Sequence, residues 1–278
     1  MKIAISAEST IDLTKELLNK YDIKTVPFTV IMGQQEYLDG EIENQQIYDF
    51  VAKENILPKT SAVNQFQYEE HFKNILKDSD AIIHFSLSSE ISSAYSNAVA
   101  VANTLKNVHI IDTRSLSTGI ALLAIKASEM ANENKSLDEI LKTINNLIEK
   151  VQASFILDKL KYLYKGGRCS SLAMFGANIL SIKPQIVLKD GKMIVGKKYI
   201  GKLDIATAKY CEDTLNACSG FDLSHAFITC TTATPTMLKV AKESLEKRGF
   251  KNIHYTNAGA TITSHCGPNT IGILFIKE

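Results

Sequence analysis

The stretch AIIHFSLSSEISSAYSNAVAVANTL, residues 81–105, holds two structural patterns joined by a serine-rich segment. Apart from His84, its first five residues are apolar, which is typical of a buried strand. Apolar and small residues then recur at helical spacing from Ile91 to Leu105, which predicts a helix. Five serines gather between Ser86 and Ser93. The stretch therefore predicts a strand, a serine-rich turn and a helix N-terminus, whose unpaired N–H groups favour anions.

The same alternation of short apolar runs and amphipathic segments fills the rest of the first half. Strands are expected at residues 3–5, 25–32 and 108–111, and helices at residues 10–21, 43–53, from 64 onward and from 137 to 151. Ser136 and Glu139 have the spacing of a capping box at the start of the last of these helices. Residues 33–40 and 58–61 are expected to be connecting loops. This alternation is typical of a parallel sheet covered by helices.

The second half has a different pattern. Residues 186–188 and 193–195 are apolar runs on either side of Asp190-Gly191, which predicts a β-hairpin that a purely parallel sheet would not contain. Further helices are expected at residues 205–217 and 235–247, and strands at residues 226–230 and 271–276. Since single cores stop growing at roughly 250 to 300 residues, a chain of 278 residues suggests two domains. We expect an N-terminal α/β/α domain with a parallel sheet at residues 1–152. A C-terminal α+β domain with a mixed or antiparallel sheet should follow at residues 153–278.

The composition excludes several classes of protein. Because 31 basic residues balance 30 acidic ones, the charge gives no reason to expect binding to nucleic acid or to an anionic membrane surface. The apolar run at residues 1–6 is too short for a signal peptide, and no run reaches about 18 apolar residues, so we expect a cytoplasmic protein without an integral membrane segment. Neither a P-loop nor a dinucleotide-binding glycine motif occurs, so no nucleotide site is expected on this chain.

Metal and disulfide chemistry also lack a motif. The five cysteines include no Cys-x-x-Cys pair, so free thiols are expected, and Cys266 is noteworthy only because it adjoins His265. The six histidines show no ligand spacing, and we predict no metal site.

Three polar clusters remain in this largely apolar chain. They are Thr60-Ser61, Ser92-Ser93 at a predicted helix start, and His265 within residues 263–268. Each has an ordinary structural interpretation, namely a loop or helix cap for the first two and a hydrogen-bonded loop histidine for the third. The first two clusters serve an anion as readily as a structural role, whereas His265 judged alone favours the structural role.

A fourth feature is Arg168, which follows the glycine pair Gly166-Gly167. Glycine pairs commonly end helices, so Arg168 could be a solvated surface residue. Held by a fixed backbone, the same guanidinium could bind a phosphate or carboxylate through two parallel hydrogen bonds.

Taken together, these residues resemble the DegV family of bacterial lipid-binding proteins over essentially the whole chain. The motif Leu-x-Tyr-Leu followed by Lys-Gly-Gly-Arg is the most specific of those shared. The shared motifs, in chain order, are Glu8-Ser9-Thr10-x-Asp12-Leu13, Lys59-Thr60-Ser61, Ile91-Ser92-Ser93-Ala94-Tyr95, Asp112-Thr113-x-Ser115, Leu160-x-Tyr162-Leu163-x-Lys165-Gly166-Gly167-Arg168 and His265-x-Gly267-Pro268.

The resemblance implies a two-domain fold that holds one long-chain fatty acid in the cleft between the domains. It also implies a role as the acyl-binding subunit of a fatty acid kinase, not catalytic on its own, with ATP and magnesium on the kinase partner. The carboxylate would be bound by Thr60, Ser61, Ser92, Ser93 and His265. In the same comparison, Arg168 falls in the motif associated with the partner and the transferred phosphate.

The chain departs from the family pattern at several of these positions. Glu8 stands where the family commonly has aspartate, and residues 62–64 read Ala-Val-Asn where it has Gln-Pro-Ser. Ser93 and Asn269 each stand where it has glycine. A Cβ at Ser93 is expected to crowd the head group.

Two other functions remain open. A lipid carrier without a kinase partner would need the same binding residues. An acyl hydrolase could use Ser92 as nucleophile and His265 as base, although the chain has neither a Gly-x-Ser-x-Gly motif nor an evident third residue of a triad.

Overall fold

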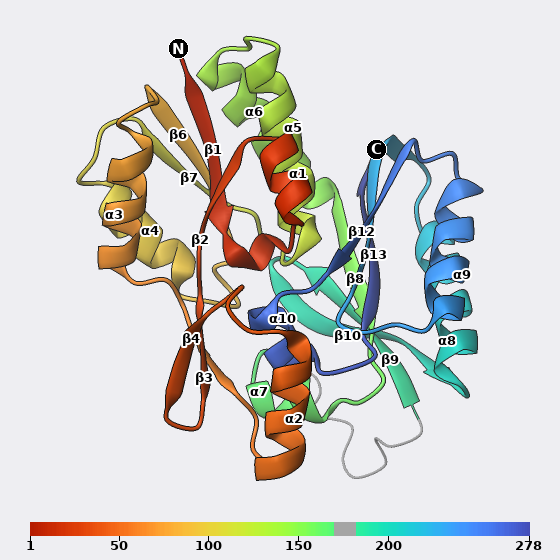
Figure 1. Cartoon of the computed structure of the whole chain (residues 1–278). Coiled ribbons are helices and arrows are strands. Elements are labelled where there is room, and N and C mark those ends of the chain that lie inside the picture. Colours follow the sequence, from red (N-terminus) through yellow and green to blue (C-terminus); the bar gives the residue numbers. More distant parts are fainter. Residues whose placement is uncertain (170–181) are drawn as a thin grey trace.

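The computed structural model describes residues 1–169 and 182–278, which form three sheets and their covering helices (Figure 1). The first sheet contains β1 (Ile3–Glu8), β2 (Ile23–Val26), β6 (Ala81–Ser86) and β7 (Val108–Asp112). The four strands are parallel and lie in the order β2-β1-β6-β7. All six residues of β6 are buried, as expected for a central parallel strand. The parallel sheet predicted for the first half is confirmed.

Helices cover both faces of this sheet (Figure 1). One face carries α3 (Gln65–Ile75) and α4 (Ala94–Ala102), and the other carries α1 (Lys15–Lys20), α5 (Thr118–Asn132) and α6 (Leu137–Leu147). The capping box at Ser136 and Glu139 is present. The single helix predicted at residues 10–21 is wrong: a 3-10 turn, η1 (Ser9–Ile11), ends at Asp12, whose φ is 54°. That left-handed backbone cannot continue a helix, and α1 begins only after a new cap at Thr14.

A small antiparallel sheet lies below the first one in Figure 1. It consists of β3 (Thr29–Met32), β4 (Gln35–Leu38) and β5 (Lys59–Ser61), in the order β4-β3-β5, and α2 (Asn44–Glu54) connects its outer strands. The loops predicted at residues 33–40 and 58–61 are therefore wrong in part. Both β4 and β5 are short edge strands with exposed polar residues, so their sequences lack the apolar alternation of a strand.

The third sheet belongs to the second half of the chain and is mixed, as predicted. Its strands are β8 (Val151–Ile156), β9 (Ile182–Lys189), β10 (Lys192–Ile200), β11 (Phe221–Cys230), β12 (Asn252–Asn257) and β13 (Ile271–Lys277), in the order β10-β9-β8-β13-β11-β12. Only the β11–β12 pair among these described strands is parallel. Asp190 and Gly191, with φ of 51° and 78°, form the predicted hairpin turn between β9 and β10. Helices α8 (Leu203–Asn216) and α9 (Pro235–Glu246) cover its outer face (Figure 1).

Helix α5 joins the two halves into one core. It contacts β1 and β6 of the first sheet and β8, β11 and β13 of the third. One continuous apolar cluster accordingly includes Ile83 from β6, Phe155 from β8 and Phe227 from β11. The chain passes from the first sheet to the third between α6 and β8, through η2 (Ile148–Lys150). The division into domains at residue 152 stays a prediction.

Two short helices complete the described fold, α7 (Lys161–Gly166) and α10 (Ala260–Cys266). In Figure 1 they lie side by side with α2, between the small sheet and the third sheet, and α10 contacts both α2 and α7. Within residues 1–169 and 182–278, no helix combines the length and apolarity needed to cross a membrane.

Candidate functional site

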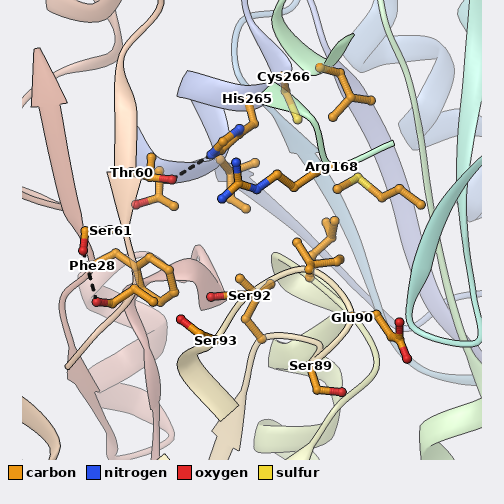
Figure 2. A pocket seen from close by; sticks show the side chains of 18 of the residues that line it. Phe28, Thr60, Ser61, Ser89, Glu90, Ser92, Ser93, Arg168, His265 and Cys266 are labelled. Atoms are coloured by element: carbon orange, nitrogen blue, oxygen red, sulfur yellow. Dashed lines mark hydrogen bonds between the residues drawn. The ribbon is translucent and has the colours of Figure 1, made fainter. Parts of the chain in front are cut away.

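A cavity of about 650 Å³ lies where the small sheet, the serine-rich turn, α7 and α10 meet. Its lining includes every residue predicted from the polar clusters, although they come from four separate elements (Figure 2). These residues are Thr60 and Ser61 on β5, Ser92 and Ser93 before α4, Arg168 after α7, and His265 on α10. Volumes of 300 to 1,000 Å³ are typical of sites for small ligands.

Thr60 and His265 form the central polar contact of this cavity. The Thr60 hydroxyl and His265 Nε2 lie 2.7 Å apart and are hydrogen-bonded, although the two residues are 205 positions apart in sequence (Figure 2). His265 was predicted to lie in a loop, but it lies in the last turn of α10. The sequence does not show this helix because its seven residues are too few for a clear apolar period.

His265 is neutral at pH 7. Burial, with a further effect from the positive charge of Arg168, lowers the pKa of its imidazole to about 4. In the tautomer with a proton on Nε2, the imidazole donates to Thr60, and the Thr60 hydroxyl proton is then available to an anion. An anionic ligand close to the ring would raise this pKa again.

Arg168 lines the same cavity as the residues of the three polar clusters. Its side chain extends across the cavity toward Thr60 and His265 (Figure 2), and its Nη1 donates to the Gly166 carbonyl at 2.7 Å. The backbone turns here because Gly167 ends α7 with φ of 71°. A positive charge therefore lies close to the point where an anionic head group would contact Thr60.

Two glycines allow α7 and α10 to pack closely against each other. A Cβ placed on Gly166 would lie 2.7 Å from His265 Nδ1, and a Cβ on Gly267 would lie 2.4 Å from the Tyr162 ring. A glycine at the end of α7 thus faces a ring of α10, and the glycine directly after α10 faces a ring of α7. The sequence contains both glycines within recognisable motifs, but their close contacts with His265 and Tyr162 appear only in the structure.

The serine-rich turn has an unstrained backbone. Ser93 has φ of −79° and ψ of 0°, so the serine that replaces the family's glycine needs no left-handed conformation. Ser92 Oγ accepts a hydrogen bond from the Ala94 N–H at 3.2 Å, which supports the capping interpretation yet leaves the Ser92 hydroxyl proton free to donate. Asn269, at the other glycine position, has φ of 58°, a conformation that asparagine tolerates.

A buried carboxylate, Glu8, supports this turn from beneath. It accepts hydrogen bonds from the Leu87 N–H at 2.8 Å, the Tyr68 hydroxyl at 2.5 Å and His84 Nε2 at 3.1 Å. Burial alone raises the pKa of Glu8, but the hydrogen bonds and charge of these partners hold it below its usual value. Glu8 is therefore charged at neutral pH and fixes the start of the serine-rich turn.

Two further carboxyl groups, those of Asp12 and Asp39, hold the N-terminus of α10. Asp12 accepts from the Gly259 N–H and Asp39 from the Ala260 N–H, both at 2.8 Å, and Ser117 also donates to Asp12. Burial raises the pKa of Asp12 to about 8, against the effect of its hydrogen bonds. Sequence analysis missed this supporting role, because Asp39 belongs to no motif and Asp12 was noted only as part of one.

The inner walls of the cavity are apolar. They are formed by Phe28, Ala62, Leu87, Ile91, Leu116, Leu163, Met193 and Ile262. Exposed residues such as Ser61 and Ser93 lie at the mouth, whereas Leu87 and Leu116 are buried. Across the described parts of the chain, no three His, Cys, Asp or Glu side chains are grouped so that they could hold a metal ion. The site thus joins exposed polar groups, with Arg168 and Glu90 both among them, to a buried apolar surface, an arrangement that suits an amphipathic ligand.

Comparison with known proteins identifies the family. The sequence profile described as "Uncharacterised protein, DegV family" matches residues 2–278. A DegV domain-containing protein of Caldanaerobacter subterraneus is 29% identical over 284 residues, which cover 100% of this chain and 99% of the relative. A DegV family protein of Thermus thermophilus has the same fold, with a TM-score of 0.91 at 23% identity over 100% of both chains. The crystal structure of DegV from Bacillus subtilis, described as a fatty acid binding protein, gives a TM-score of 0.84 at 25% identity over 100% of both chains. The chain belongs to the DegV family.

Proposed function

We propose that this protein binds a long-chain fatty acid in the 650 Å³ cavity. The carboxylate lies at the mouth, where Thr60, Ser61, Ser92, Ser93 and His265 supply hydrogen bonds, and the tail extends into the apolar interior. The observation that carries the proposal is the Thr60–His265 pair beside Arg168 in a cavity that also has a large apolar surface. The fatty acid binding described for Bacillus subtilis DegV supports it.

The tail supplies most of the affinity in this proposal. A sixteen-carbon acid has about fourteen methylenes, each worth about 0.8 kcal/mol when buried, so the gross gain is about 11 kcal/mol. Ordering and rigid-body costs take back about 4 kcal/mol or more. Hydrogen bonds to the charged carboxylate add about 1.5 to 3 kcal/mol each. Their main effect is to fix which carboxylate oxygen points outward.

We further propose that the bound carboxylate is phosphorylated by a separate kinase subunit, which supplies ATP and magnesium. A carboxylate oxygen is itself the nucleophile in such a reaction, so the acyl-binding chain needs to position it and neutralise charge, and it needs no base. Arg168 is suited to both tasks, because its guanidinium lies beside the head-group residues and remains charged at every physiological pH.

A carrier without a kinase partner is the second candidate, since the same cavity would serve it. The hydrolase is less well supported. His265 Nε2 is hydrogen-bonded to Thr60, and the hydrogen bond of Ser92 is with the Ala94 N–H, so the contact between nucleophile and base is missing.

Native mass spectrometry of the purified protein tests the binding proposal. We expect one bound fatty acid per chain, or uptake of added palmitate or oleate by delipidated protein. Protein that is free of lipid and takes up neither acid would refute the proposal. A pull-down from the source cell separates the carrier from the kinase subunit, since only the latter retains a partner that forms acyl phosphate from ATP.

A further inference from the structure

Ser88 is a fully buried residue of the serine-rich turn, and it is not among the residues that line the cavity. Its backbone N–H donates to the Ser115 carbonyl at 3.0 Å. Its own carbonyl accepts from the Ile91 N–H at 2.9 Å and from the Ser92 N–H at 3.2 Å. The backbone of Ser92, whose hydroxyl belongs to the candidate head-group site, is therefore held directly by Ser88.

The side chain of Ser88 reaches the second half of the chain. Its hydroxyl donates to the Gly191 carbonyl at 2.8 Å and accepts from the Glu90 N–H at 3.3 Å. Gly191 lies at the tip of the β9–β10 hairpin, 103 positions away from Ser88 in sequence. A Cβ on Gly191 would lie 2.6 Å from Ser88 Oγ and 3.2 Å from Glu90 Cγ. The hairpin tip thus fits closely against the serine-rich turn because position 191 has no side chain.

Further polar contacts between these segments lie at the surface. Arg114 Nη2 donates to the Asp190 carbonyl at 2.5 Å, and Lys192 Nζ lies 3.3 Å from Glu90 Oε2. The Lys192 and Glu90 side chains are 63% and 38% exposed, so water and salt weaken their ion pair. The hydrogen bond from Ser88 to the hairpin is buried, and its loss would leave a buried carbonyl without this donor. The buried bond therefore contributes most to holding the hairpin tip on the turn.

We propose that Ser88 is a positioning residue for the head-group site, because it fixes the backbone of Ser92 relative to the tip of the β9–β10 hairpin. This inference rests on the proposed function and deepens it, since it makes the third sheet a determinant of where the Ser92 hydroxyl lies. Ser88 does not line the cavity, so its effect on ligand affinity must pass through the residues that it holds. Ser92 is the head-group residue that is bonded to it.

Isothermal titration of delipidated protein with palmitate tests this inference through a double-mutant cycle. Ser88→Ala should weaken palmitate binding by about 2- to 150-fold, the range for groups coupled through one hydrogen-bond network. In a Ser92→Ala background the same change should weaken binding by less than about 2-fold, because the hydroxyl that Ser88 positions is gone. Ser128→Ala is the control, since Ser128 is also a buried serine that donates to a distant carbonyl, that of Tyr21, at 2.6 Å. It should leave the palmitate affinity unchanged.

Gly191→Ala disturbs the same contact from the side of the hairpin. It should also weaken palmitate binding, and by less than about 2-fold when Ser92 is already alanine. Gly201→Ala is its matched control, because Gly201 also has a positive φ, of 104°, but a Cβ there meets no other heavy atom within 4 Å. Unchanged affinity in both Ser88→Ala and Gly191→Ala, or losses of equal size with and without the Ser92 hydroxyl, would overturn the inference while leaving fatty acid binding intact. Wild-type protein that binds no fatty acid would instead overturn the proposed function.

Discussion

Gly166→Ala should disable the head-group site while leaving the tail cavity in place. The added Cβ would lie 2.7 Å from His265 Nδ1, 3.5 Å from Cε1 and 3.7 Å from Cγ. The two similar carbon distances place it in the plane of the ring, beyond Nδ1. The imidazole is thus held between Gly166 on one side and the Thr60 hydroxyl on the other, 2.7 Å from Nε2.

The ring has no direct way to make room for this methyl group. Relief requires the contact to lengthen from 2.7 Å to the 3.4 Å of ordinary van der Waals contact, a shift of about 0.7 Å. Translation away from Gly166 would compress the Thr60 hydrogen bond, so the ring must rotate and break it. Loss of a hydrogen bond network to a charged ligand costs about 1.5 to 3 kcal/mol, so palmitate should bind about 10- to 150-fold more weakly. Overpacking should also lower the free energy of unfolding by about 1 to 3 kcal/mol.

Isothermal titration of delipidated protein with palmitate measures the first effect and urea unfolding the second. Gly167→Asn is the control, because a Cβ at Gly167 meets no other heavy atom within 4 Å and asparagine tolerates its φ of 71°. It should bind palmitate as the wild type does. Wild-type affinity in Gly166→Ala would show that the ring's contact with Gly166 is not needed to orient it, and would refute this reasoning.

The further predictions concern three side chains, those of Ser92, Arg168 and Asp12. Ser92→Ala should weaken palmitate binding by about 1 to 3 kcal/mol without changing the fold, which titration and circular dichroism can check; an unchanged affinity would remove Ser92 from the head-group site. Arg168→Ala should raise the pKa of His265 above about 4, because a neighbouring positive charge is removed, and an NMR titration of the ring resonances measures this. The same variant should retain most tail-driven affinity yet lose acyl-phosphate formation with the cognate kinase. Arg168→Lys should restore acyl-phosphate formation only in part. Equal loss of fatty acid binding and acyl-phosphate formation would mean that Arg168 supports the pocket alone. Asp12 has a pKa of about 8 in the folded state against an ordinary value of 3.8. Between these two pH values the folded state binds more protons than the unfolded state. The contribution of Asp12 to stability therefore falls as pH rises from about 4 to 8. Asp12→Asn, which keeps an acceptor for the Gly259 N–H, should flatten this decline in urea unfolding; an identical pH profile would contradict the role of Asp12.

Local sequence patterns predict the elements that bury apolar residues. The strand at Ala81–Ser86, the capping box at Ser136 and the hairpin turn at Asp190-Gly191 all form as expected. Short or polar elements cannot be predicted from such patterns. β4 and β5 have too few buried residues to produce a period, and α10 is buried but too short and too rich in hydroxyl residues to show one. The positions of all three depend on contacts with distant parts of the chain.

The candidate site could likewise be predicted only in part from the sequence. Its residue types could be found because hydroxyls, an imidazole and an arginine stand out in an apolar chain, and the resemblance to a family groups them. Their geometry could not be found, since the support from Glu8, Asp12 and Asp39 depends on side chains that converge from separate elements. The neutral state of His265 likewise depends on burial, which no local pattern reveals.

The pairing of Thr60 with His265 has a consequence for how the protein is made. The two residues are separated by 205 positions, and the helix that carries His265 is held by the carboxyl groups of Asp12 and Asp39 from the first forty residues. A ribosome synthesises the chain from its N-terminus, so the apolar wall around Leu87 emerges long before α10 exists to close it. During that interval a nascent chain has no complete head-group site and exposes part of the cavity lining. Under the proposed function, a fatty acid can therefore bind only after α10 has been synthesised.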